Sequence, residues 1–128
     1  MGDRHRREQL ARRHAAAKWA SLIHAKAELS SSVRVGRGVV VMAGAVVNSG
    51  AVLGEHCIVN TGAIVEHDVT IGARVQVAPG VAIGGGAVIS DGAQLGLEPG
   101  FAITSRLVRM RSLAWAPLSS AMLRPAKP

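Results

Sequence analysis

The chain has 128 residues, of which 48% are hydrophobic and 2% aromatic, with 15 glycines and a formal net charge of +7. This length suits one modest domain and excludes two cores of ordinary size. The basic residues gather at the ends, nine in residues 1–37 and five in residues 106–128, whereas between them Arg74 stands alone against five acids. The central region is therefore acidic. With no aromatic stacking platform or nucleic-acid module in the sequence, we expect no nucleic acid as partner.

The N-terminal segment, residues 1–22, is predicted to be a basic helix with a linker. Residues 3–19 fit one helix, with Asp3 as its cap. Arg and Glu occupy the place where a signal peptide needs an apolar run, and no apolar stretch reaches the roughly 20 residues of a membrane span. Cys57 is the single cysteine, so no internal disulfide can form. We expect a cytoplasmic protein without a membrane span.

Residues 23–100 follow a period of six. Branched aliphatics occupy every sixth position: Ile23, Leu29, Val35, Val41, Val47, Leu53, Val59, Val65, Ile71, Val77, Ile83, Ile89 and Leu95. Smaller residues recur two positions earlier, from Val33 to Ala93, and include Cys57, which we expect to be packed inside and inert. Glycine recurs at the intervening turn positions, as at Gly38 and Gly44, where a positive φ favours it.

This period predicts an all-β solenoid. Each hexad supplies a short strand and a corner, and three hexads close one triangular coil. Adjacent coils then stack at about 4.8 Å as a parallel β-ladder, and residues 23–95 give about four coils. An open sheet or sandwich is disfavoured because no helical periodicity separates the strands. The spacing leaves the handedness open.

The C-terminal residues, 101–128, break the period. Pro99, Phe101 and Trp115 stand among basic and apolar residues. We expect an irregular tail, with a short helix around residues 104–114 as an alternative.

Two stretches carry a family resemblance: residues 60–68, Asn-Thr-Gly-Ala-Ile-Val-Glu-His-Asp, and residues 41–48 upstream. They resemble the sialic acid O-acetyltransferase and UDP-amino-sugar N-acetyltransferase family, over roughly residues 2–96. The resemblance implies a left-handed parallel β-helix, acetyl-CoA as cosubstrate, and a homotrimer with active sites between adjacent β-helices. Residues 1–22 are similar to the last helix of that family's N-terminal sugar-nucleotide-binding domain, and we interpret them as its remnant.

Acetyl transfer needs a base for the nucleophile and a donor for the developing oxyanion. His67 is the candidate base, because imidazole titrates near neutral pH and a neighbouring carboxylate can fix its tautomer. By the resemblance, Asp68 is that carboxylate and Glu66 is the reserve choice. A lone surface histidine is more often solvated than catalytic, and the flanking acids reverse that preference here.

The acetyl donor is predicted to bind beside His67. Three hexads after it stands Gly85, so no side chain is expected beneath the imidazole. By the resemblance, the Gly85 amide, flanked by Gly84 and Gly86, contacts acetyl-CoA. Gln76 stands where the family usually has a second, donor-contacting histidine, and its amide could still donate a hydrogen bond.

The acceptor is predicted to be a sugar or sugar nucleotide that is acetylated on an amino or hydroxyl group. By the resemblance, Asn60 lies near it. The rival hypothesis is a catalytically impaired β-helical fragment that serves as an oligomerisation or scaffold module. The γ-class carbonic anhydrases share this fold and bind metal through three histidines. Only His56 and His67 lie on the coils proper, eleven positions apart, so we expect no metal.

Overall fold

The computed structural model describes residues 4–96 and the backbone of residues 106–108. These residues form α1 (Arg4–Arg13) followed by a series of very short strands. The strands are β1 (Leu22–Ile23), β2 (Glu28–Leu29), β3 (Arg34–Val35), β4 (Val40–Val41), β5 (Val46–Val47), β6 (Val52–Leu53), β7 (Ile58–Val59), β8 (Ile64–Val65), β9 (Thr70–Ile71), β10 (Gln76–Val77), β11 (Val81–Ile83), β12 (Val88–Ile89), β13 (Gln94–Leu95) and β14 (Arg106–Val108).

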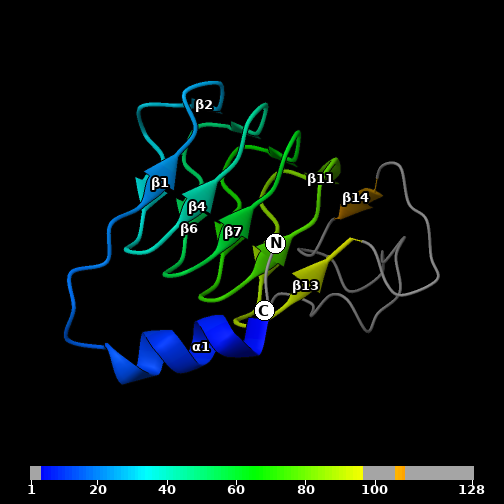
Figure 1. Ribbon diagram of the computed structural model, residues 1–128. Coiled ribbons are helices and arrows are strands. Elements are labelled where there is room, and N and C mark those ends of the chain that lie inside the picture. The colour runs from blue at the N-terminus through cyan, green and yellow to red at the C-terminus, as the bar shows by residue number, and fades with distance from the viewer. Residues whose placement is uncertain (1–3, 97–105, 109–128) are drawn as a thin grey trace.

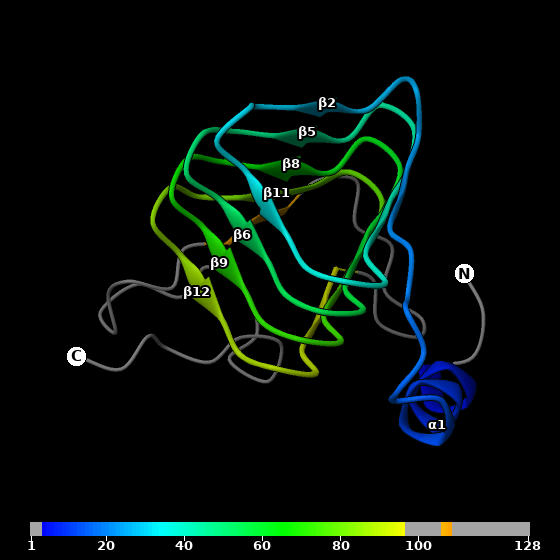
Figure 2. The same cartoon turned by 90° about the vertical axis from the view of Figure 1, so that its left-hand side faces the viewer.

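The strands stack into three parallel sheets, one for each side of a triangular coil. Sheet A is β1-β4-β7-β10-β13, sheet B is β14-β11-β8-β5-β2, and sheet C is β12-β9-β6-β3. Val40 pairs with Ile58, which pairs with Gln76, so each coil takes up three hexads, as the sequence predicts. Seen from its N-terminal end in Figure 2, the chain turns anticlockwise as it recedes. The fold is therefore a left-handed parallel β-helix.

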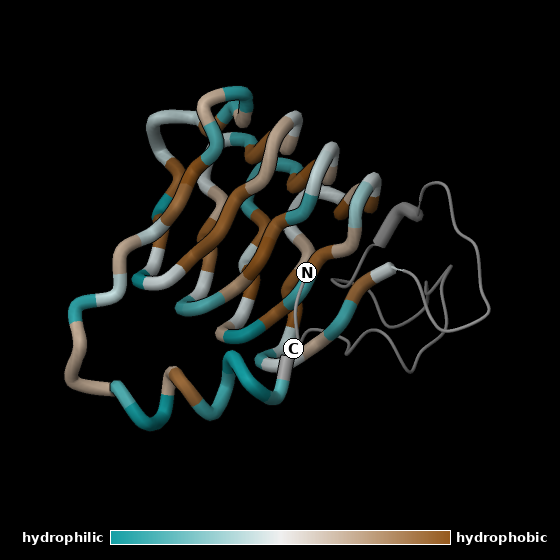
Figure 3. Tube along the Cα trace, in the orientation of Figure 1, coloured by the Kyte–Doolittle hydropathy of each residue, from teal (hydrophilic) through white to brown (hydrophobic). Residues whose placement is uncertain are grey.

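The core is a column of aliphatic side chains along the axis of the β-helix. Both inward registers are buried from Val39 to Leu95 except at Ala93, which is half-buried, and Leu53, Ile71, Ile83 and Ile89 are 0–1% exposed. Branched side chains suit such short, pleated strands, and Figure 3 shows the apolar positions recurring coil after coil. The first coil is less covered, since Ile23 is 46% exposed at the open N-terminal edge.

From residue 38 to residue 92, each hexad places one residue with positive φ at its corner. Glycine takes this position at Gly38, Gly44, Gly50, Gly62, Gly80, Gly86 and Gly92. The other corners place His56, Asp68 and Arg74 there, with φ of 57–58°. A left-handed conformation costs a residue with a Cβ about 1 kcal/mol or more, so these three corners carry strain that the glycine corners avoid.

The helix is shorter than predicted. It ends at Arg13 rather than continuing to residue 19, and the Asp3 cap lies outside the described residues. Beyond it the chain turns back: the His14 carbonyl accepts hydrogen bonds from the Ala17 N–H at 2.9 Å and from Trp19 Nε1 at 3.1 Å. The prediction was wrong here because a tertiary contact of Trp19 overrides the helix propensity of the intervening alanines.

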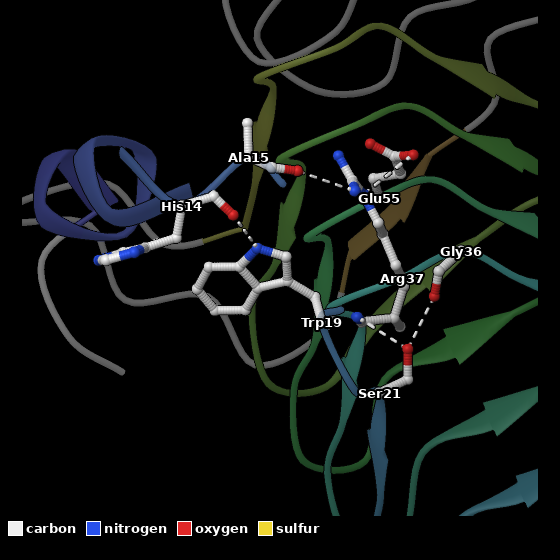
Figure 4. Close-up of polar contacts among 8 residues, drawn as sticks. His14, Ala15, Trp19, Ser21, Gly36, Arg37 and Glu55 are labelled. Atoms are coloured by element: carbon white, nitrogen blue, oxygen red, sulfur yellow. Dashed lines mark hydrogen bonds and ion pairs between the residues drawn. The ribbon is translucent and has the colours of Figure 1, made fainter. Parts of the chain in front are cut away.

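α1 runs alongside the corner where sheet C leads into sheet A, roughly along the axis of the β-helix (Figures 1 and 2). Arg7 Nη2 donates to the Gly38 carbonyl at 3.4 Å, and Arg37 joins the Ala15 carbonyl to Glu55. The Trp19 ring meets His56 edge-on, with ring centroids 5.0 Å apart. Figure 4 shows the contacts of Arg37 with Ala15 and Glu55, together with the hydrogen bond from Ser21 to the Gly36 carbonyl. The N-terminal segment is thus tied to the first coils.

The described part of the tail rejoins the β-helix. β14 adds to the edge of sheet B, where Val81 pairs with Arg106. Other paired residues are three hexads apart in the sequence, whereas Val81 and Arg106 are further apart. The chain therefore contains extra residues before it returns to sheet B. A continuous helix over residues 104–114 is excluded by this strand, and the rest of the predicted tail lies outside the described residues. None of the described helices is long and apolar enough to cross a bilayer.

Candidate active site

The predicted catalytic residues lie on the corner that joins sheet B to sheet C, here called the B–C corner. Four successive coils contribute residues 30–32, 48–50, 66–68 and 84–86 to this corner. Backbone hydrogen bonds hold them in line: the Asp68 N–H donates to Ser49 O, and the Gly86 N–H to His67 O, both at 2.9 Å. Residues three hexads apart therefore lie one above another.

His67 and Asp68 form a pair on the surface of this corner. His67 Nδ1 lies 3.1 Å from Asp68 Oδ2, and the two side chains are 65% and 71% exposed. An ionised carboxylate can only accept a hydrogen bond, so Nδ1 is the donor. In the neutral ring the proton then stays on Nδ1, and Nε2 keeps a free lone pair that can take up a proton.

Gly50 makes room for Asp68. A Cβ built on Gly50 would collide with Asp68 Oδ1. The Asp68 backbone has a φ of 57°, a conformation that aspartate tolerates better than most residues. The carboxylate is thus placed by its own backbone and by the missing side chain one coil earlier.

Glu66 is engaged elsewhere. Its Oε1 accepts a hydrogen bond from Asn48 Nδ2 at 2.8 Å, and both residues are half-buried. The structure therefore pairs Asp68, and not the reserve candidate Glu66, with His67. Sequence reasoning did not single out Asn48, although its position one coil before Glu66 predicts this contact.

The imidazole faces Gly85, as the period predicts. A Cβ on Gly85 would lie 2.6 Å from His67 Nε2 and 2.9 Å from Cε1. Among the described residues, no acceptor receives the Gly85 N–H, whereas the Gly86 N–H is used by His67 O. Nε2 therefore lies directly against Gly85, whose backbone N–H remains available as a donor. The carbonyl of Gly84, the first glycine of the run, accepts the Ala87 N–H at 3.2 Å.

Asn60 and Gln76 lie away from His67 within this chain. Asn60 is on the corner between sheets A and B, where its Nδ2 donates to Val77 O at 3.0 Å. Gln76 is in β10 of sheet A, between Ile58 and Gln94 in the neighbouring coils. A single chain thus brings together residues 66–68 and 84–86, and not these two.

The other titratable candidates, Cys57 and His24, have surroundings that suggest structural roles. Cys57 is buried in the inward register, and burial raises its pKa to about 12, so the thiol stays protonated as expected of an inert core residue. His24 is exposed, and its Nδ1 accepts the Lys26 N–H at 3.0 Å. In the described part of the chain, no three His, Cys, Asp or Glu side chains gather as a metal site would require.

Comparisons with known proteins identify the repeat. Residues 50–85 match the family model "Bacterial transferase hexapeptide (six repeats)". A search of curated protein sequences gives no significant match.

Solved structures similar to the chain include a mutant of perosamine N-acetyltransferase from Caulobacter crescentus, in complex with CoA and GDP-perosamine. It is 34% identical, with a TM-score of 0.70, over 87% of this chain and 49% of that one. The acetyltransferase domain of PglB from Neisseria gonorrhoeae is 39% identical, with a TM-score of 0.63, over 73% of this chain and 50% of that domain. The same domain in complex with acetyl coenzyme A is 30% identical, with a TM-score of 0.66, over 86% of this chain and 63% of that one.

The chain thus spans about half the length of the first two of these proteins. The repeat, the left-handed β-helix and these similarities together show that it belongs to the bacterial hexapeptide-repeat transferase family, with sugar N-acetyltransferases among its structural relatives.

Proposed function

We propose that this chain transfers an acetyl group from acetyl-CoA to an amino or hydroxyl group of a sugar or sugar nucleotide. The observation that carries the proposal is the placement of His67, with Nδ1 beside Asp68 and Nε2 against the Gly85 backbone. Relatives whose solved complexes contain CoA, acetyl coenzyme A or GDP-perosamine support the choice of donor and acceptor.

In the proposed mechanism, His67 Nε2 removes a proton from the acceptor as its nitrogen or oxygen attacks the thioester carbonyl carbon. Asp68 stabilises the imidazolium that forms, through Nδ1. The Gly85 N–H donates to the oxyanion of the tetrahedral intermediate. When the C–S bond breaks, His67 returns the proton to the departing thiolate. The products are the acetylated acceptor and CoA with its thiol.

We also propose that the active unit is a homotrimer. Asn60 and Gln76 lie on sheet A and its corner with sheet B, whereas His67 lies on the B–C corner. In a three-fold assembly the B–C corner of one copy can face sheet A of the next. A neighbour's Gln76 could then contact the donor, and its Asn60 the acceptor.

The test is the rate of acetyl transfer by the His67→Ala variant. Release of the CoA thiol would be followed with a thiol reagent, using a panel of amino sugars and nucleotide-linked amino sugars as acceptors. Loss of a general base is expected to lower kcat by about 10²- to 10⁴-fold. The matched control is His24→Ala, which removes an exposed histidine from another corner and should leave the rate unchanged.

An unchanged rate in His67→Ala would show that the residue is not the base. Calorimetric titration with acetyl-CoA addresses the rival hypothesis separately. If the wild-type protein bound no acetyl-CoA at millimolar concentration, the chain would be an oligomerisation or scaffold module instead of an enzyme.

A further inference from the structure

His67 is flanked in sequence by two acids, and the structure uses them differently. Asp68 Oδ2 lies 3.1 Å from the imidazole Nδ1, whereas Glu66 Oε1 lies 2.8 Å from the Asn48 amide. Two carboxylates beside one imidazole would favour the doubly protonated ring, since each stabilises the positive charge. A ring in that state cannot act as a base. Separation of the two acids therefore keeps more of the ring in the form that can act as a base.

The coil that precedes the site sets this separation. Asn48 Nδ2 donates to Glu66, and Gly50, two residues on, leaves the space that Asp68 fills. This coil is itself fixed, because the Gly50 N–H donates to Ser32 Oγ at 2.9 Å. Glu66 is thus hydrogen-bonded to Asn48, and Asp68 lies beside the imidazole.

We propose that Asn48 is a positioning residue for this site: by binding Glu66 it keeps the second carboxylate away from His67, so that Asp68 alone pairs with the ring. Asn48 acts through Glu66 and touches no reacting atom. Its effect on the transfer rate depends on the proposed function, whereas its effect on the charge state of the ring does not.

The experiment measures the protonation state of the His67 ring at pH 7 by NMR of its ring nitrogens, in the full chain. In Asn48→Ala, Glu66 loses its donor and can approach the ring. We expect the ratio of doubly to singly protonated ring to rise about fourfold, the effect of one added charge at about 5 Å in a water-like medium. The double variant Asn48→Ala, Glu66→Ala should show the ratio of Glu66→Ala alone.

Two further variants separate positioning from simple loss of structure. Asn48→Asp keeps the shape of the side chain but repels Glu66, so it should shift the ring in the same direction as Asn48→Ala. Ser31→Ala changes an exposed serine on the same corner, two coils before His67, and should leave the ring unchanged. Thermal unfolding of each variant shows whether it remains folded.

The proposal is overturned if the ring of folded Asn48→Ala or Asn48→Asp has the wild-type protonation state, or if removal of Glu66 does not reverse the change. In the transfer assay, Asn48→Ala should lower kcat with little change in KM, and the double variant should recover kcat to that of Glu66→Ala. If the ring responds as expected but wild-type protein transfers no acetyl group, the positioning role stands and the proposed function fails.

Discussion

Two glycines shape the candidate site through the side chains that they lack. Gly50 leaves space for the Asp68 carboxylate, and Gly85 leaves space for the His67 imidazole. Gly85 needs no positive φ, unlike the neighbouring Gly86. Its role is therefore steric, so an added methyl group would act on the site and not on the backbone.

Gly85→Ala is accordingly expected to impair activity more than stability. Its Cβ would lie 2.6 Å from His67 Nε2, so the imidazole would have to turn away and the space for a thioester would shrink. We expect acetyl transfer to fall by about 10²-fold, the loss that follows misalignment of a reacting group. Steady-state kinetics and thermal unfolding of the same variant check this.

Gly44→Ala is the matched control, because it should impair stability more than activity. A Cβ there meets only ordinary contacts, the nearest at 3.7 Å, but the backbone has a φ of 73°. This variant should lose about 1 kcal/mol of stability and retain its transfer rate. A Gly85→Ala protein as active as the wild type would show that the space above Gly85 is not used.

At the scale of elements, the segment that follows α1 packs against a histidine at a strained corner. His56 takes a φ of 58° and packs against Trp19. Burial lowers the pKa of His56, and the positive charges of Arg7, Arg37 and Arg74 lower it further, against the opposing effect of Glu55. The folded chain therefore binds this proton less readily than the unfolded chain.

The pH dependence of stability follows from that difference. Between the unfolded pKa near 6.5 and the lower folded pKa, the unfolded state holds more protons, so stability falls as the pH is lowered through this window. We expect the Tm of the wild type to drop more steeply below about pH 6.5 than that of His56→Asn, in which asparagine tolerates the same backbone. Parallel curves from thermal scans on either side of neutral pH would contradict this.

The repeat made most of the β-helix predictable from the sequence. A large aliphatic at every sixth residue has one solution in which all are buried, and the same period placed His67 over Gly85. Contacts that depend on a single side chain were not predictable. Trp19 ends α1 early by folding back onto His14, and the insertion before β14 conceals its return to sheet B.

The handedness of the coil and the role of Asn48 differ in how far the sequence alone could have predicted them. Spacing is the same for either hand, so the left-handed coiling came from the family resemblance. Asn48 lies one coil before Glu66, and that contact could have been found by following polar residues along the period as well as the aliphatic ones.

At the scale of the whole molecule, the predicted site is divided between separate faces. Residues 66–68 and 84–86 share the B–C corner, whereas Gln76 lies on sheet A. If the proposed trimer unites them, each site needs His67 from one copy and Gln76 from its neighbour.

Mixing two inactive variants tests that arrangement. His67→Ala and Gln76→Ala chains, each impaired alone, should regain activity when coexpressed with different tags and purified as hybrids. Each hybrid trimer contains both wild-type residues at one of its three interfaces, so activity per site should approach about a third of wild type. Hybrids no more active than their parents would show that the two residues do not meet across an interface.

The central claim is that the imidazole of His67 and the bare amide of Gly85, one coil apart, enclose the reacting thioester. The most direct measurement is a crystal structure of this protein with bound acetyl-CoA. The account predicts the thioester carbonyl oxygen about 3 Å from the Gly85 nitrogen, with its carbon beside His67 Nε2. A thioester bound away from the B–C corner, with the Gly85 N–H facing only water, would contradict it.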